Sequence, residues 1–167
     1  ENRLEKAQSL MYLNQIDILL ITTEQFMRYF TGFSTQFWQS PTRPWYLIIP
    51  IKGLPKVVIP DIGFSAMQKT WIKEIYTWPS PKPKDEGISL ISRVINEIPS
   101  KFNIIGAELG KEMSLRMPLK DFFLLQSTLS RKIIDASSIL WKLRLIKSNA
   151  EIDKIKHICK IASNSFE

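Results

Sequence analysis

The sequence has 167 residues, 44% of them hydrophobic and 23% charged, and is therefore long enough to bury a core without disulfides or metal ions. Its single cysteine, Cys159, excludes an internal disulfide and suits a reducing cytoplasm, and no apolar run is long enough to span a membrane. Lysine and arginine exceed aspartate and glutamate by 23 to 16, but the lysines are scattered, so we expect no nucleic-acid partner and no membrane partner.

The first part of the chain predicts a helix followed by a buried strand. Residues 2–14 place apolar side chains at helical spacing, which indicates an amphipathic helix. Residues 16–21 are apolar except for Asp17, a pattern typical of a central strand covered on both faces. The segment 22–24 can begin a short helical turn, and Gly32 gives the backbone the freedom for a sharp exit.

The next segment predicts an antiparallel hairpin, because two β-rich runs at 45–50 and 55–60 are joined by a short link that contains Gly53. Asp61 is then expected to cap a helix that ends near Lys73. Its apolar stripe would consist of Phe64, Met67, Gln68 and Trp71.

The second half of the chain alternates between strands and helices. Strands are expected at 75–78, 102–108 and 131–135, and helices after Asp85 and Pro118. A proline-rich loop at 79–83 is expected to be a surface connector. The whole pattern predicts an α/β fold with three layers, α/β/α, around a mixed sheet, because one hairpin is antiparallel and the later crossovers are helical.

The last 31 residues differ from the rest. Residues 137–147 indicate a helix, and Ser148 and Glu151 have the spacing of a capping box ahead of a further helix. The apolar stripe of this last helix still runs where the chain stops, as expected for a cut through a longer protein. It consists of Ile152, Ile155, Ile158, Cys159, Ala162 and Phe166. We expect residues 1–136 to form the α/β domain and residues 137–167 to be a helical linker and the first helix of a further domain.

The residue types needed for catalysis are scarce. The only histidine, His157, falls on the polar side of the last helix, so we expect neither a metal centre nor a catalytic triad within this chain. Cys159 lies on the apolar stripe and is expected to be a small core residue rather than a nucleophile. The glycines at 106 and 110 lack the spacing of a dinucleotide-binding loop. We therefore expect no catalytic residues and no cofactor in this chain.

The loop between Phe33 and Trp45 is the best candidate for a contact site. It brings Phe37, Trp38 and Arg43 together in a short proline-bounded segment, and exposed tryptophan and arginine side chains often anchor interfaces or hold carboxylates. The alternative is that the aromatic rings fold back onto the hairpin as core. That alternative is open for Phe37 and favoured for Trp45, whereas Arg43 is expected to face outward.

Six stretches, in this order, resemble the N-terminal domain of the creatinase and prolidase family, which includes Xaa-Pro aminopeptidases and Xaa-Pro dipeptidases. They are DILLI at 17–21, RYFTGF at 28–33, the pair LIIP at 47–50 and VVIP at 57–60, IGAE at 105–108, and LRLIKSNAEI at 143–152. The resemblance covers nearly the whole chain, and the last stretch is similar to the usual bridge into the family's catalytic domain.

The resemblance implies an N-terminal α/β domain followed by a pita-bread metallohydrolase domain with two manganese, cobalt or zinc ions, which activate water for attack on the bond before proline. The N-terminal domain of such enzymes mediates dimerisation and can lend a residue to the partner subunit's active site. We therefore expect a non-catalytic domain of a homodimeric Xaa-Pro peptidase that also shapes the access of substrate. The contact residues would be among Phe37, Trp38 and Arg43, and the resemblance does not single out one of them.

Two alternatives remain open at this stage. The parent protein could be a creatinase-like enzyme that cleaves a C–N or C–S bond outside peptides. It could also be a catalytically inactive relative that binds proteins, in which case the net charge of +7 predicts acidic partners.

Overall fold

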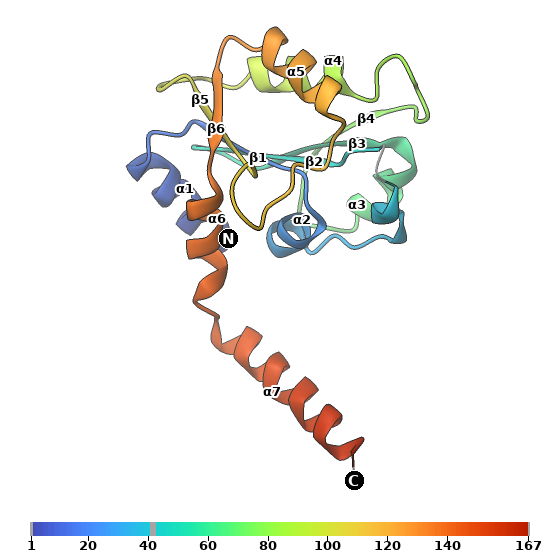
Figure 1. The fold of residues 1–167 in the computed structure, drawn as a ribbon, viewed down its shortest axis with the longest axis vertical. Coiled ribbons are helices and arrows are strands. Elements are labelled where there is room, and N and C mark those ends of the chain that lie inside the picture. The colour runs from blue at the N-terminus through green and yellow to red at the C-terminus, as the bar shows by residue number, and fades with distance from the viewer. Residues whose placement is uncertain (1, 41–42, 167) are drawn as a thin grey trace.

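The computed structural model describes residues 2–40 and 43–166. In this part of the chain, six strands form one sheet in the order β4-β3-β2-β1-β5-β6, and helices cover both of its faces (Figure 1). The strands are β1 Ile18–Ile21, β2 Tyr46–Pro50, β3 Lys56–Pro60, β4 Glu74–Trp78, β5 Ile104–Ala107 and β6 Lys132–Asp135. The prediction of a three-layer α/β fold is confirmed.

The sheet is mixed, as predicted. Strand β2 is antiparallel to both β1 and β3, while β1 with β5, β5 with β6, and β3 with β4 are parallel pairs. At the centre, Leu19 of β1 lies opposite Ile49 of β2 and Gly106 of β5. All four residues of β1 are buried, which explains why its sequence is a continuous apolar run.

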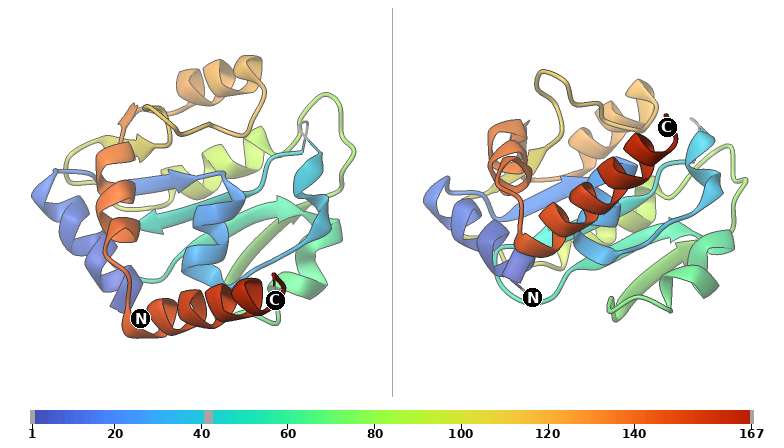
Figure 2. Two further views of the ribbon diagram at one scale, coloured as in Figure 1. Left: turned by 60° about the horizontal axis from the view of Figure 1, so that its bottom comes forward. Right: turned by 90° about the horizontal axis from the view of Figure 1, so that it is seen from below.

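Two helical layers follow from the alternation of side chains along the strands. Leu19 and Ile21 belong to the core beneath α1 Asn2–Leu13, α2 Glu24–Thr31 and α6 Ser137–Leu145. Ile18 and Leu20 belong to the core beneath α4 Ile88–Asn96 and α5 Leu119–Thr128. Figure 2 shows the sheet from two further directions, with α6 beside α1.

The helix expected from Asp61 to about Lys73 is wrong in length. The structure has only a 3-10 turn, η2 Asp61–Gly63, and one helical turn, α3 Phe64–Met67. The Thr70 hydroxyl donates to the carbonyl of Met67 and accepts from the N–H of Ile72, so a side chain ends the helix by competing for its backbone bonds. Of the expected stripe, only Met67 is buried.

The structure matches the two predicted helix ends at Gly32 and Asp85 to different extents. Gly32 ends α2 in the left-handed conformation, as predicted. Asp85 accepts a hydrogen bond from the N–H of Ser89 at 3.1 Å, but the residue next to the helix is Gly87, which is also left-handed. The carboxylate of Asp85 therefore caps α4 from two positions further out than the usual cap.

The packed unit continues past residue 136, where the sequence suggested a boundary. Ile139, Leu140 and Leu143 of α6 are buried in the same core as α1. Among the described helices, only α7 Asn149–Asn164 extends away from the layers (Figure 1). Its predicted capping box, formed by Ser148 and Glu151, is confirmed, but α7 buries no residue and Cys159 is exposed rather than part of the core.

The close approach of β5 to the segment after β6 predicts a sensitive glycine. A Cβ atom on Gly106 would lie 2.6 Å from the Cβ of Ala136, so Gly106→Ala is expected to lower the free energy of unfolding by about 1–3 kcal/mol. Urea unfolding measures this change. The control Ser138→Ala, at an exposed position of α6, should stay within about 0.5 kcal/mol of the wild type. Equal stability of the two variants would contradict the packing described above.

Candidate functional site

The carboxyl ends of β1 and β5 lie side by side at one edge of the sheet. From β1 the chain passes through α2 and loop 33–45 to β2 on one side, whereas β5 flanks β1 on the other. In open α/β sheets, ligands bind at the carboxyl ends of strands where the connections diverge in this way. Loop 33–45 enters β2 at this same edge, so its residues lie where ligands bind in such sheets.

The structure separates the contact residues expected from the sequence. The ring of Phe37 is 39% exposed and Arg43 is half-buried, so both reach the surface. Trp38 is only 3% exposed and Trp45 only 2%, so the surface position expected of Trp38 is not what the structure shows. Pro41 and Thr42, in the same loop, lie outside the described residues.

An aromatic cluster explains the burial of Trp38. Its ring lies 5.5 Å from that of Trp45 and 6.4 Å from that of Phe33, measured between centroids. The indole N–H groups of Trp38 and Trp45 have no hydrogen-bond acceptor among the described residues. Ring packing rather than hydrogen bonding therefore holds both side chains, and this cluster forms the base of loop 33–45.

The positive charge of Arg43 contributes to the pKa of Glu86. Burial raises the pKa of Glu86, but hydrogen bonds from Trp78, Lys82 and Ser80 outweigh that effect, and the positive charge of Arg43 lowers the pKa further. The carboxylate of Glu86 organises loop 79–87 by accepting these hydrogen bonds, and its pKa responds to the charge of Arg43.

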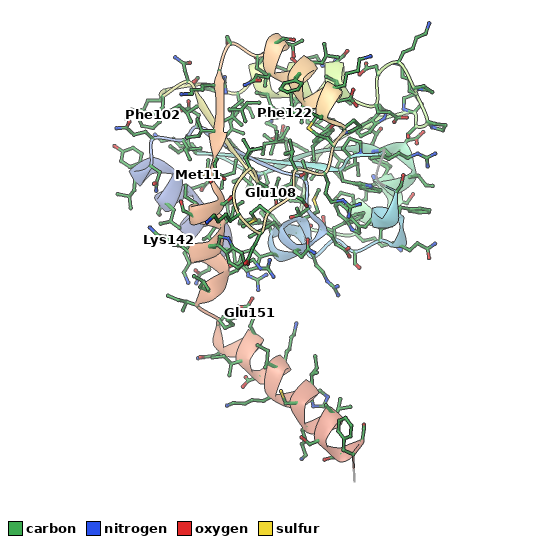
Figure 3. All side chains as sticks on the ribbon, viewed as in Figure 1. Met11, Phe102, Glu108, Phe122, Lys142 and Glu151 are labelled. Atoms are coloured by element: carbon green, nitrogen blue, oxygen red, sulfur yellow. The ribbon has the colours of Figure 1, made fainter. Side chains whose placement is uncertain are left out.

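A buried carboxylate, Glu108, joins the ends of β1 and β5. Its Oε2 atom accepts hydrogen bonds from the N–H of Thr22 at 2.7 Å, the N–H of Thr23 at 3.1 Å and the hydroxyl of Thr22 at 3.1 Å, and Oε1 accepts from the hydroxyl of Thr23. Burial raises the pKa of Glu108 and prevails over these four hydrogen bonds, which lower it. Figure 3 labels Glu108 within the domain and Glu151 at the start of α7.

Thr22 and Thr23, which bond to Glu108, and Arg116, which bonds to Thr22, were not predicted from the sequence as site residues. A signal was present, because Glu108 directly follows a buried strand and a buried carboxylate needs hydrogen-bond donors. The two threonines directly follow the neighbouring strand. Arg116 gave no such signal, since it lies in a segment without periodicity.

No group of three or more His, Cys, Asp and Glu side chains able to hold a metal ion occurs among residues 2–40 and 43–166. His157 is exposed on α7. Within the same described ranges, no helix has the length and apolar character required to cross a bilayer.

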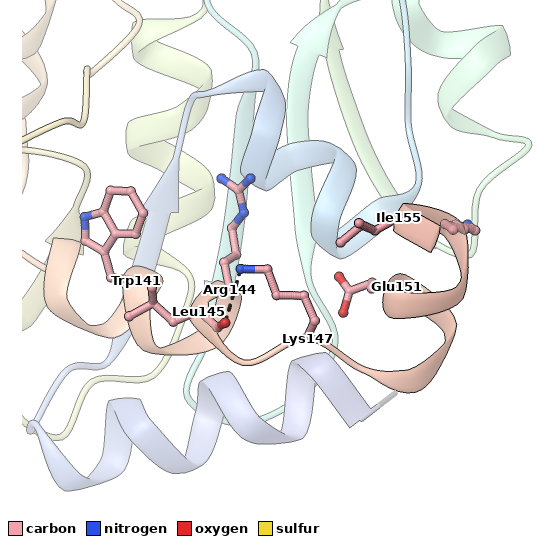
Figure 4. A pocket seen from close by; sticks show the side chains of 7 residues that line it. Trp141, Arg144, Leu145, Lys147, Glu151 and Ile155 are labelled. Atoms are coloured by element: carbon pink, nitrogen blue, oxygen red, sulfur yellow. Dashed lines mark hydrogen bonds between the residues drawn. The ribbon is translucent and has the colours of Figure 1, made fainter. Parts of the chain in front are cut away.

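A hollow with a volume of about 340 Å³ lies between α6 and α7 (Figure 4). Trp141, Arg144 and Leu145 line it from α6, and Glu151 and Ile155 line it from α7. An ion pair of 2.9 Å between Glu151 and Arg3 of α1 connects the first turn of α7 to the domain. Beyond that turn, the apolar side chains of α7 face solvent.

Comparison with known proteins places this architecture in a family. Residues 3–146 match the family model described as the creatinase/prolidase N-terminal domain. The chain belongs to this family. No curated protein sequence matches the chain significantly.

Solved structures of creatinase/prolidase proteins share the fold. The prolidase from Thermococcus sibiricus is similar over 98% of this chain and 42% of its own, with a TM-score of 0.80 and 19% identity. The prolidase from Pyrococcus horikoshii is similar over 99% of this chain and 41% of its own, with a TM-score of 0.71 and 19% identity. This chain therefore spans about two fifths of the length of those prolidases.

A shorter structure is similar as well. The creatinase/prolidase N-terminal domain of an X-Pro dipeptidase from Streptococcus pyogenes is similar over 84% of this chain and 98% of its own chain. The TM-score is 0.67 and the identity is 13%. The fold therefore also occurs as a separately crystallised domain.

The two buried carboxylates of the β1–β5 pair predict opposite responses to pH. The pKa of Glu108 is raised above the ordinary 4.5, so its contribution favours folding below that value and is lost as the pH rises through the folded pKa. For Asp17, burial raises the pKa, but hydrogen bonds from Lys101, Ser100, Phe102 and Ile104 lower it below the ordinary 3.8. Its contribution is therefore present above 3.8 and is lost as the pH falls through the folded pKa.

Urea unfolding of the wild type, Glu108→Gln and Asp17→Asn over a series of pH values tests this. The wild type should gain stability relative to Glu108→Gln as the pH falls towards 4.5, and lose stability relative to Asp17→Asn below 3.8. Slopes of the same sign for both pairs would contradict the assignment.

Proposed function

We propose that this chain is the non-catalytic N-terminal domain of an Xaa-Pro dipeptidase-like dinuclear metallohydrolase, and that it contributes to dimerisation and to the route by which substrate reaches the catalytic domain. The observation that carries the proposal is α7. The similarity to the Thermococcus and Pyrococcus prolidases leaves only 1–2% of this chain uncovered, a share smaller than this 16-residue helix, so it extends over α7.

The exposed apolar face of α7 is a physical reason to propose a domain that packs against this helix. Helices of this length are marginal in water by themselves, and most helices in proteins are stabilised by burying an apolar face. In α7 that face is open to solvent, and Ile158 is 65% exposed. A catalytic domain that follows α7 would cover it.

The chemistry would belong to that second domain. Two manganese, cobalt or zinc ions held by its Asp, His and Glu side chains would activate a water for attack on the Xaa-Pro bond. The described residues of this chain would supply the surroundings. Phe37 offers an exposed ring and Arg43 a guanidinium suited to a carboxylate, from either the substrate or the partner subunit.

Activity assays test the proposal. The complete protein carrying this domain should hydrolyse Xaa-Pro dipeptides when manganese is added, and residues 1–167 alone should not. Arg43→Ala should raise KM about tenfold, because one charge-assisted hydrogen bond to a carboxylate is lost, whereas Arg93→Ala on the exposed side of α4 should leave KM unchanged.

Other outcomes of the assay would favour the alternatives. Turnover of creatine without Xaa-Pro cleavage would make the parent a creatinase-like hydrolase or lyase. No turnover, together with salt-sensitive retention of acidic proteins, would make it an inactive binding relative.

Dimerisation is tested separately, by light scattering of residues 1–167 across a dilution series. We expect a homodimer, and we expect Phe37→Ala to weaken it about tenfold or more if loop 33–45 forms part of the contact. Phe123→Ala on α5 is the matched control, because that ring is also exposed. A monomer at every concentration, or a loss of dimer only in Phe123→Ala, would contradict this role of the loop.

A further inference from the structure

The buried carboxylate of Glu108 and the two threonines bonded to it, Thr22 and Thr23, are called the Glu108 cluster below. Arg116 connects this cluster to loop 33–45 through its backbone N–H and its guanidinium group. Its backbone N–H donates to the hydroxyl oxygen of Thr22 at 2.9 Å. Its guanidinium Nη2 donates to the main-chain carbonyl of Trp38, and its Cζ atom lies 5.9 Å from the centroid of the Trp38 ring. One residue therefore contacts both the end of β1 and the turn η1 Gln36–Gln39.

The carboxylate of Glu108 sets the direction of this connection. The hydroxyl of Thr22 has a single hydrogen, which it donates to Glu108 at 3.1 Å, so its lone pair is free to accept from the N–H of Arg116. Because a carboxylate accepts but does not donate, it fixes this orientation of the hydroxyl. The order of donors and acceptors is consistent from Arg116 through Thr22 to Glu108.

The turn η1 is held at its base and at its end. The hydroxyl of Thr35 accepts from the N–H of Phe37, and the N–H of Ser40 donates to the carbonyl of Phe37 at 3.2 Å. The ring of Trp38 is packed in the aromatic cluster, and its carbonyl is bound by Arg116. Phe37, which lies next to Trp38 in the chain, is thereby presented at the surface.

Arg116 makes no ion pair with any carboxylate of the described residues. Its positive charge faces a carbonyl oxygen and the face of an indole ring instead. A guanidinium in this position fixes geometry rather than neutralising a charge.

From these contacts we propose that Arg116 is a positioning residue for the turn η1, oriented by Glu108 through Thr22, and that it holds Phe37 where this side chain meets substrate or the partner subunit. The functional meaning of this positioning rests on the proposed function. The positioning itself depends only on the contacts described above.

Hydrogen exchange of residues 1–167, followed by mass spectrometry, tests the positioning. Arg116→Met keeps the apolar length of the side chain but cannot donate, and should accelerate exchange in residues 36–40 about tenfold or more without changing exchange in β1 and β5. Arg116→Lys retains a donor and should restore part of the protection. Glu108→Gln should produce the same local acceleration as Arg116→Met, because it removes the fixed carboxylate acceptor.

Two matched controls lie at the opposite edge of the sheet. Arg131 also donates from Nη2 to a main-chain carbonyl, that of Ile98, and Asp17 is also a buried carboxylate that accepts backbone N–H bonds. Arg131→Met and Asp17→Asn should leave exchange in residues 36–40 unchanged. Exchange in Arg116→Met within about twofold of wild type, or equal acceleration in either control, would overturn the positioning role.

Kinetics of the complete protein separate this inference from the proposed function. If both hold, Arg116→Met should raise KM about fivefold and leave kcat unchanged, because the contact is displaced while the catalytic domain is intact. Faster local exchange with an unchanged KM would leave the positioning established and overturn the role of loop 33–45 in substrate access. Unchanged exchange would overturn the positioning whatever the kinetics.

Discussion

The parallel pairing of β1 with β5 depends on a buried carboxylate at each of its ends. At the amino end, Asp17 accepts hydrogen bonds from three backbone N–H groups and the hydroxyl of Ser100, all from the segment that leads into β5. At the carboxyl end, Glu108 accepts from the N–H and hydroxyl groups of Thr22 and Thr23. Neither carboxylate is exposed, so removing its partners would leave an uncompensated buried charge.

The two ends of the β1–β5 pair therefore differ. At the amino end, the hydrogen bonds of Asp17 stay within one short stretch of chain that leads into β5. The Glu108 cluster extends further, because the hydroxyl of Thr22 also receives the N–H of Arg116, whose side chain reaches Trp38. The rigid centre of the sheet is therefore connected by hydrogen bonds to a loop that carries an exposed aromatic ring and a half-buried arginine.

The main elements of the fold could be predicted because each left a local pattern in the sequence. The apolar run at β1, the link with Gly53 and the pair of Ser148 and Glu151 each specify structure through interactions within a few residues. The helix predicted from Asp61 failed because the hydroxyl of Thr70 takes backbone bonds that periodicity does not reveal. Cys159 was predicted to be a core residue but is exposed, because an apolar stripe on a helix does not specify which surface covers it.

The candidate site was less predictable, for a related reason. Trp38 and Phe37 are adjacent aromatic residues, and only the tertiary packing against Phe33 and Trp45 decides which ring is buried. The link from Arg116 to Trp38 joins residues 78 positions apart and follows no sequence periodicity. Contacts of this kind become visible only when the fold is known.

The exposed thiol of Cys159 has a practical consequence. Because it is the single cysteine and lies in the second half of α7, a thiol-reactive fluorophore would label this chain at one known position. The colour and anisotropy of that dye would change when another surface closes over the helix. The chain thus carries an intrinsic attachment point from which the burial of its last helix can be followed in real time.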